Sequence, residues 1–123
     1  SILNNVKFGI RGDNDSRKNK ALEFLKLFKV DQYANSYPNN LSGGEQQRVA
    51  IARSISPNPK ILLMDEPFGS LDDDLKKELR EETKKIIKKN KTTCILVTHN
   101  IEDALSMSDR IIRLKNGKIE EEK

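Results

Sequence analysis

The apolar residues of this chain fall into short groups whose spacing separates helices from strands. Residues 16–28 carry apolar side chains at helical spacing from Ala21 to Phe28, which predicts an amphipathic helix. Residues 31–40 show no such period, and with Pro38 and two asparagines at their end they indicate a short helix or a loop. The N-terminal part of the chain is therefore expected to consist of helices and loops.

A second helix is predicted to begin at Ser42, because Ser42 and Glu45 have the spacing of a capping box. Its apolar positions continue until Pro57 and Pro59, which end the helix. The first turn contains two glycines, which lower the stability of a helix. The pattern thus predicts a capped but intrinsically weak helix start.

The middle of the chain reads as strand, helix and strand. Residues 61–64 are a continuous apolar run that ends at Asp65 and Glu66, which is typical of a buried parallel strand. Residues 72–89 have the spacing of a long amphipathic helix, and residues 93–98 form a second β-rich run. This order predicts a parallel crossover.

Two smaller elements are expected at the C-terminal end. Asn100 is placed to cap a short helix that reaches Ser106. Residues 110–120 alternate around the pair Asn116 and Gly117, which is a strong hairpin turn signal. A closing β-hairpin is therefore predicted.

Composition limits the classes of function. Apolar residues make up 35% and charged residues 34% of the 123 positions, and 23 basic residues are mixed with 19 acidic ones. The lysines of residues 84–91 are interpreted as a solvated helix face, so no nucleic-acid partner is expected. Cys94 is the single cysteine, and no apolar stretch approaches the roughly 20 residues of a membrane span. Together with the lack of a signal segment, this predicts a cytoplasmic protein.

The helix start at Ser42, Gly43 and Gly44 has the features of a phosphate-binding site. It offers a hydroxyl, backbone N–H groups and the positive end of a helix dipole, and the glycines let an anion approach closely. The alternative is an ordinary capped helix after a glycine turn. These residues alone leave both interpretations open.

Asp65, Glu66 and His99 follow the two predicted parallel strands, so they are expected at the same edge of the sheet, where α/β proteins bind ligands. Asp65 is suited to hold Mg²⁺, and Glu66 to orient an attacking water. His99, the only histidine, is suited to sense a phosphate. The alternatives are two solvated carboxylates in a turn and a structural histidine.

Four ordered motifs together resemble the ABC ATPase family over essentially the whole chain. LSGGEQQR at residues 41–48 resembles the family signature motif, and ILLMDE at residues 61–66 resembles a Walker B strand with its catalytic glutamate. Residues 70–72 resemble the D-loop, and His99 resembles the switch histidine. The resemblance implies an α/β fold, namely part of a P-loop NTPase. Residues 1–57 would be the helical subdomain with the signature motif, and residues 58–123 the C-terminal half of the parallel-sheet core.

The resemblance also implies roles for these residues, with ATP and Mg²⁺ as cofactors. Asp65 would hold Mg²⁺, Glu66 would act as general base and His99 would contact the γ-phosphate. A second ATPase subunit would form a head-to-tail dimer with this one. The residues implied to close over its nucleotide or to shape the dimer interface are Ser42, Gly43, Gly44, Gln46, Gln47 and Asp72.

One departure from the family pattern is large. The sequence contains neither a GxxxxGK[ST] phosphate loop nor the family's glutamine loop, and residues 1–10 resemble the stretch that follows the latter. The chain is therefore expected to begin near the middle of the domain, and alone neither to bind ATP tightly nor to hydrolyse it. An uncovered parallel sheet would expose an edge and apolar surface, so self-association is also expected.

Three functions remain open. Residues 66–79, EPFGSLDDDLKKEL, resemble importer ATPases of the sulfate, polyamine, iron and sugar type, which implies transmembrane permease subunits as partners and a place at the inner face of the cell membrane. A non-transport ABC ATPase of DNA repair or translation is the second. A non-catalytic docking fragment is the third, and the intact Glu66 argues against it.

A set of large apolar residues in the helical part would face the membrane subunits in the family, but most of them are expected in the core. They are Phe24, Leu25, Leu27, Phe28, Tyr33 and Tyr37.

Overall fold

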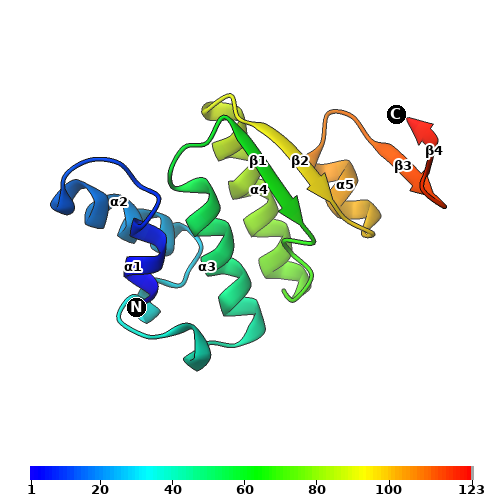
Figure 1. Cartoon of the computed structure of the whole chain (residues 1–123). Coiled ribbons are helices and arrows are strands. Elements are labelled where there is room, and N and C mark those ends of the chain that lie inside the picture. Colours follow the sequence, from blue (N-terminus) through cyan, green and yellow to red (C-terminus); the bar gives the residue numbers. More distant parts are fainter. Residues whose placement is uncertain (123) are drawn as a thin grey trace.

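The computed structural model describes the backbone of residues 1–122 and the side chains of residues 1–120. The N-terminal part is purely helical, and every strand in the described residues lies after residue 60 (Figure 1). The elements are, in order, α1 (Ile2–Lys7), α2 (Asn14–Leu27), the 3-10 helices η1 (Asp31–Tyr33) and η2 (Pro38–Asn40), α3 (Gly43–Ile55), β1 (Ile61–Asp65), α4 (Asp73–Lys89), β2 (Thr93–Val97), α5 (Ile101–Met107), β3 (Ile112–Lys115) and β4 (Lys118–Glu122).

Side-chain caps mark where the α-helices begin. Each α-helix begins after a residue whose side-chain oxygen accepts a hydrogen bond from a backbone N–H of the first turn, which satisfies one of the free donors there. At α3 both halves of the predicted capping box are present. The capping residues are Ser1, Asp13, Ser42, Asp72 and Asn100.

The opening helix α1 is the one α-helix that the apolar pattern did not predict. Its six residues are too few for a clear period, and only Ile2 and Val6, one turn apart, are buried. Backbone N–H groups of Ile2 and Leu3 donate to carbonyls of Ser36 and Ala34, at 2.9 Å each. Tertiary contacts with the loop before α3 therefore hold this helix in place.

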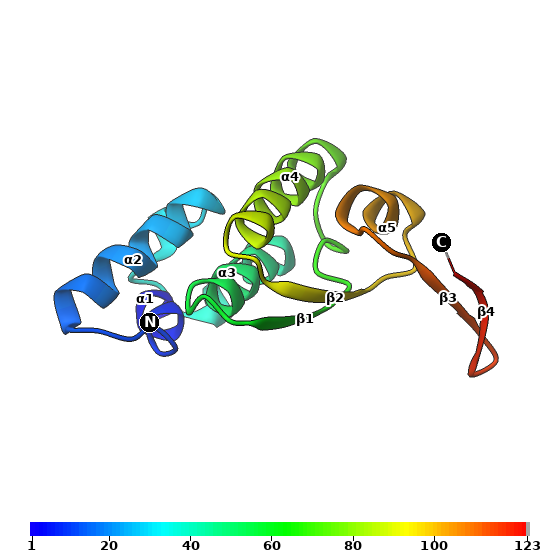
Figure 2. The ribbon, with the colours of Figure 1, turned by 90° about the horizontal axis from the view of Figure 1, so that it is seen from above.

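Strands β1 and β2 pair in parallel, with Ile61 opposite Thr93 and Asp65 opposite Val97, which confirms the predicted crossover through α4. The helices lie on one side of the two strands (Figure 2). Leu62 and Met64 point to that side and are buried. Because no element covers the opposite side within the described residues, the apolar residues there are exposed; they form the open sheet face, namely Ile61, Leu63, Ile95 and Val97.

The prediction of a buried strand at residues 61–64 therefore holds for one face only. A continuous apolar run predicts cover on both sides, whereas β1 alternates between buried and exposed positions. The expected apolar exposure is confirmed, since Leu63 is 70% exposed. Cys94 is half-buried on β2, and burial raises the pKa of its thiol.

The core is one connected cluster of buried side chains that runs from Val6 and Leu25 to Phe68 and Leu79. It joins the helical N-terminal part to β1 and α4, so the division at residues 57 and 58 stays a prediction. The large apolar residues of the helical part are mostly covered, as expected. Leu25 and Phe28 are buried, Phe24, Leu27 and Tyr33 are partly buried, and Tyr37 is exposed.

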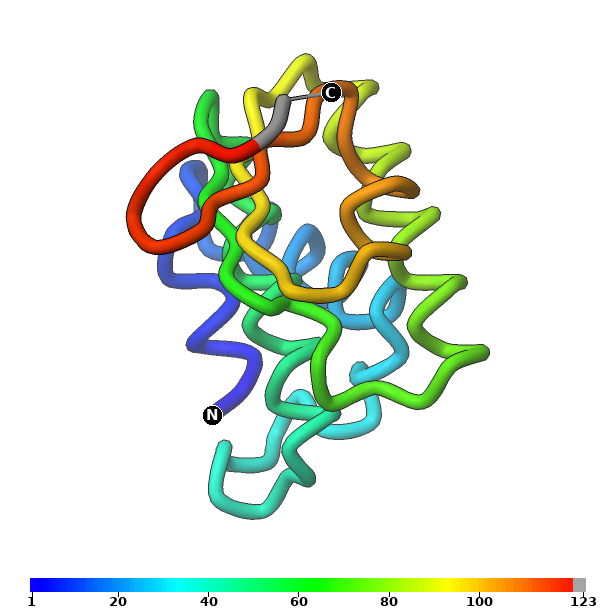
Figure 3. Tube along the Cα trace, turned by 90° about the vertical axis from the view of Figure 1, so that its right-hand side faces the viewer, coloured from blue at the N-terminus to red at the C-terminus, as the bar shows by residue number. Residues whose placement is uncertain are grey.

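The C-terminal hairpin has the predicted form. Strands β3 and β4 pair antiparallel, and both residues of the turn, Asn116 and Gly117, have positive φ angles of 52° and 75°. The hairpin projects beyond α5, far from the N-terminus (Figure 1). In the end-on view the hairpin and α5 lie on opposite sides of β2 (Figure 3). Of the helices within residues 1–122, none combines the length and apolar character that a membrane crossing requires.

Candidate active site

The end of β1 delivers the two carboxylates predicted from the sequence. Asp65 is the last strand residue and is exposed, and Glu66 follows it. The backbone N–H of Glu66 donates to the carbonyl of Val97 at 2.8 Å, so the parallel pairing continues one residue past the strand. The chain then turns sharply, because Glu66 has a φ of 46°, in the left-handed region that non-glycine residues rarely adopt. Such a conformation persists only where surrounding contacts hold it.

The carboxylate of Glu66 is bound by the segment that follows β2. Its Oε1 accepts a hydrogen bond from the backbone N–H of His99 at 2.7 Å and lies 2.5 Å from Nδ1 of the His99 ring. Its Oε2 accepts from the hydroxyl of Thr98 at 3.2 Å, and that hydroxyl accepts from the backbone N–H of Asn100 at 3.0 Å. The structure thus brings Glu66 and His99 together at one edge of the sheet, as predicted.

These contacts change the acidity of Glu66. Partial burial raises the pKa of its carboxyl, but the hydrogen bonds from the backbone and ring of His99 and from Thr98 lower it by more. The resulting pKa lies below the ordinary value. Glu66 is therefore ionised at neutral pH and can accept a proton. Its side chain is one-third exposed, and the ring of His99 is almost fully exposed.

The turn after Glu66 packs directly on α3. The side-chain amide of Gln47 donates to the carbonyl of Glu66 at 3.0 Å and accepts from the backbone N–H of Ser70 at 2.8 Å. A Cβ added at Gly44 would lie 3.0 Å from the carbonyl oxygen of Ser70. Glycine at this position therefore allows the close approach of helix and turn.

The start of α3 is closed by its capping box and open at Gly43. Ser42 Oγ accepts from the backbone N–H of Glu45, and Glu45 accepts from the backbone N–H of Ser42 at 2.7 Å. Tyr33 donates its hydroxyl hydrogen to Glu45 at 2.8 Å. The bond from the Ser42 backbone, followed by that from Tyr33, holds the pKa of Glu45 below its ordinary value. Nothing lies within 4 Å of a Cβ placed on Gly43, so this turn is open to a ligand.

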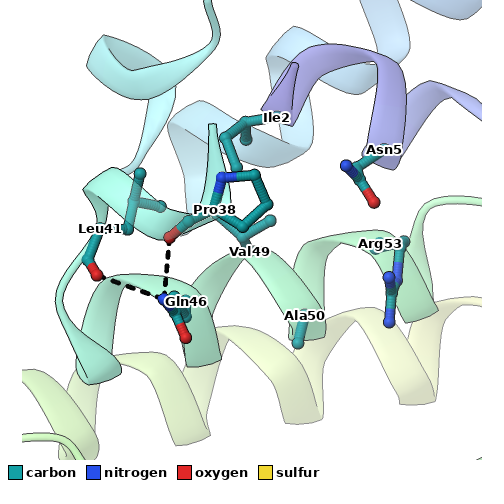
Figure 4. Close-up of a pocket in the computed structure, with 8 residues that line it drawn as sticks. All are labelled: Ile2, Asn5, Pro38, Leu41, Gln46, Val49, Ala50 and Arg53. Carbon is teal, nitrogen blue, oxygen red and sulfur yellow. Dashed lines mark hydrogen bonds between the residues drawn. The ribbon is translucent and has the colours of Figure 1, made fainter. Parts of the chain in front are cut away.

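Gln46 and Asp72, two further residues predicted to belong to the site, bond to the backbone of their own surroundings. The Gln46 amide is turned toward the helical part, where it donates to the carbonyls of Pro38 at 2.8 Å and Leu41 at 3.3 Å and lines a small cavity of about 120 Å³ (Figure 4). These contacts do not bring Gln46 to the Glu66 turn. Asp72 is exposed and caps α4 by accepting from the backbone N–H of Leu75 at 3.0 Å.

Sequence reasoning missed the contribution of Thr98 and Tyr33 to this site. Thr98 directly precedes the predicted His99, so its position was the one available signal. Tyr33 is 12 residues from Glu45 in the chain, and no local pattern connects the two. Gln47 was assigned to the dimer interface, whereas its contacts in this chain are with the Glu66 turn.

Comparison with known proteins identifies the family. A family model described as ABC transporter matches residues 2–69, which is more than half of the chain and includes the start of α3 and the end of β1. The chain belongs to the ABC transporter family. The resemblance stated from the four motifs is confirmed by this match.

Curated ABC relatives match almost the whole chain. The sulfate/thiosulfate import ATP-binding protein CysA of Mannheimia succiniciproducens is 43% identical over 98% of this chain and 36% of its own length. The spermidine/putrescine import ATP-binding protein PotA of Pasteurella multocida is 45% identical over 99% of this chain and 34% of its own length. The chain therefore spans about a third of these relatives, and its resemblance to importer ATPases of the sulfate and polyamine type is confirmed.

Solved structures show the same fold. A bacterial ABC transporter cassette solved as a dimer has a TM-score of 0.90 and 41% identity, and the match covers 100% of this chain and 56% of that one. A post-hydrolysis state of an ATP-binding cassette bound to ADP and Pi matches with a TM-score of 0.89 and 40% identity. The α/β architecture is thus that of part of an ABC ATPase cassette.

Proposed function

We propose that these residues act in the ATP-hydrolysing subunit of an ABC importer, to which they contribute the catalytic carboxylate and the signature helix. The observation that carries the proposal is the contact between Glu66 and His99, whose ring nitrogen lies 2.5 Å from the carboxylate. A carboxylate that orients water and an imidazole that contacts the γ-phosphate are groups suited to phosphoryl transfer to water. The import relatives support the transport function.

In this proposal Glu66 is the general base. Its ionised carboxylate would accept a hydrogen bond from the attacking water and then its proton. Its Oε2 accepts one hydrogen bond, from Thr98, and so keeps an acceptor site for that water. His99 would then turn its exposed ring toward the γ-phosphate. The contact seen in the structure would therefore be the resting arrangement of the pair.

Asp65 is the proposed ligand of Mg²⁺. Within residues 1–120 no three His, Cys, Asp or Glu side chains are grouped to hold a metal ion by themselves. This fits Mg²⁺, which is usually bound by one or two carboxylates together with substrate phosphates. The exposed carboxylate of Asp65 at the strand end is available for that role. When bound, the ion would neutralise phosphate charge.

The start of α3 is proposed to bind ATP held by a second ATPase subunit in a head-to-tail dimer. The open space at Gly43 and the free end of the helix fit a phosphate group. Ser42 and Gly44 would lie beside it, and Asp72 would make contacts across the dimer interface. Gln46 would support the same surface from behind, through its bonds to the backbone before Ser42. Permease subunits at the inner face of the membrane are the proposed transport partners.

The test uses the full gene product that contains these residues. We expect Mg²⁺-dependent ATP hydrolysis by the purified wild-type subunit, and for Glu66→Gln retained ATP binding with turnover slowed by about a hundredfold or more. Turnover at the wild-type rate in Glu66→Gln would contradict the proposed role of Glu66. The 123-residue polypeptide by itself has no GxxxxGK[ST] loop, so we propose that it neither binds ATP tightly nor hydrolyses it. Micromolar ATP affinity of this polypeptide would disprove that statement.

The open sheet face supports a second proposal, which concerns only the 123-residue polypeptide. Four apolar side chains from two adjacent strands are exposed side by side, and an unpaired strand edge borders them. We expect this polypeptide to self-associate through that face. Sedimentation should show an apparent mass that rises with protein concentration. The double variant Leu63→Thr, Ile95→Thr should show a smaller apparent mass at the same concentration. A monomer at high concentration would rule the association out.

A further inference from the structure

A single side chain, that of Gln47, connects α3 to the turn that carries Glu66. Its Nε2 donates to the Glu66 carbonyl at 3.0 Å, and its Oε1 accepts from the Ser70 N–H at 2.8 Å. One amide thus bonds to a carbonyl and an N–H at the two ends of the turn. Either partner alone fixes which way the amide points, and the two agree.

The turn has weak hydrogen bonds of its own. The backbone N–H of Gly69 donates to the Glu66 carbonyl at 3.3 Å, and that of Leu71 donates to Phe68 at 3.3 Å. Both distances are longer than the usual optimum for N–H···O bonds. Glu66 is in the left-handed region at a φ of 46°, which has to be stabilised from outside. The two bonds of Gln47 are the shorter ones, and they bridge the turn that begins at the strained Glu66.

The same turn also contacts α3 directly, through the backbone of Gly44 and Ser70. Gly44 approaches the carbonyl oxygen of Ser70 so closely that an added Cβ would be 3.0 Å from it. Gln47 lies three residues further along the helix and is partly buried against the turn. A movement of the first turn of α3 therefore reaches the backbone of Glu66 through two neighbouring contacts.

We propose that Gln47 is a positioning residue for hydrolysis, because it sets the backbone of Glu66 and thereby the direction of its carboxylate. This inference rests on the function proposed above. The start of α3 would face ATP bound to the second subunit, whereas Glu66 would act on ATP of its own subunit. Gln47 then links the occupancy of one site to the geometry of the other, without touching nucleotide in either.

The test is a substitution that removes both bonds and keeps the size of the side chain, Gln47→Met, in the full gene product that contains these residues. We expect kcat to fall by about tenfold or more, since a small misplacement of a catalytic group is costly. Equilibrium affinity for ATP should stay at the wild-type value, because Gln47 does not contact the nucleotide. In a Glu66→Gln background, single-turnover rates should show no further loss from Gln47→Met.

A structural measurement tests the contact apart from activity. The backbone N–H of Ser70 loses its acceptor in Gln47→Met, so its hydrogen exchange should become faster. Arg53→Met is the matched control, because Arg53 is on the same helix with an exposed side chain. It should change neither kcat nor the exchange of Ser70.

Three results would overturn the role of Gln47: an unchanged kcat in Gln47→Met, a parallel loss of ATP affinity, or an equal loss of rate in the Glu66→Gln background. Failure of the proposed function looks different. In that case the wild-type protein would not hydrolyse ATP, or Glu66→Gln would do so normally. Unchanged exchange at Ser70 would refute the contact itself, whatever the activity.

Discussion

The turn after β1 and the first turn of α3 pack on each other, yet they are held in different ways. Glu66 is held by partners 19 to 33 residues away in the chain, on α3 and after β2. Ser42 and Glu45 hold each other across three residues, and only Tyr33 contacts them from another element. The group that needs one direction is thus fixed by tertiary contacts. The helix end that offers backbone N–H groups is fixed locally and stays open at Gly43.

The largest expected effect is on the Glu66 side of this comparison. Glu66→Gln keeps the size of the side chain and removes the base, so kcat of the full gene product should fall by about a hundredfold or more. ATP affinity should be retained. ATP turnover and equilibrium binding, measured side by side, check this. Glu78→Gln on the exposed surface of α4 is the control and should leave both unchanged.

The segment that carries His99 depends on a buried ion pair. Arg80 of α4 lies 2.7 Å from Asp103 of α5, and their side chains are 11% and 1% exposed. Arg80→Met would remove the ion-pair partner of the buried Asp103 carboxyl, so the free energy of unfolding should fall by about 3 kcal/mol. Lys29→Met removes an exposed ion pair with Glu78 and should cost less than about 1 kcal/mol. Urea unfolding of the two variants would measure the difference; equal losses would argue against the pair as an anchor.

Ser42, at the start of α3, is held by local contacts, so its replacement should lower the free energy of unfolding by less than Arg80→Met does. Ser42→Ala removes one half of the capping box and should lower the free energy of unfolding by about 1 kcal/mol. Chemical denaturation with circular dichroism detection measures this loss. Ser42→Asp replaces the acceptor and should restore most of it. A loss as large as that of Arg80→Met would show that the helix start is held by more than its cap.

The contact between Tyr33 and Glu45 at the start of α3 can be followed by titration. The hydrogen bond with Glu45 raises the pKa of the Tyr33 phenol, followed by burial and by the nearby negative charge. Glu45→Gln removes the charge, so the phenol should ionise at lower pH in this variant. Phenolate absorbance against pH gives the comparison, with Tyr37 as the only other tyrosine. Identical curves would mean that the contact is not made in solution.

The smallest effect is the pH dependence of stability that comes from Glu66. Burial raises the pKa of the Glu66 carboxyl, but the hydrogen bonds from His99 and Thr98 lower it by more. The pKa in the folded state is therefore below the ordinary value. A depressed carboxyl pKa stabilises the fold above the unfolded value of about 4.3, and this stabilisation disappears as the pH falls through the folded pKa. The difference in melting temperature between wild type and Glu66→Gln should therefore shrink as the pH is lowered through the unfolded value and then through the depressed folded pKa. A constant difference would contradict the shift.

Much of the fold could be predicted because its signals are local. The capping pair Ser42 and Glu45, the apolar run before Asp65 and the hairpin turn at Asn116 each act within a few residues. The meeting of Glu66 with His99 could be predicted as well, since parallel strands end at one edge. Helix α1 could not, because its few residues have no period and its partners come from the loop before α3.

The sequence alone determined most elements of this protein, the parallel order of its strands, its family resemblance and the identity of the reactive pair Glu66 and His99. These depend on short-range pattern and strand direction. Only the tertiary structure decided that β1 is covered on one side, since cover depends on which elements pack there. It alone decided that Gln47 rather than Gln46 reaches the Glu66 turn. Two adjacent residues on a helix point about 100° apart, and only packing determines which of them meets a partner.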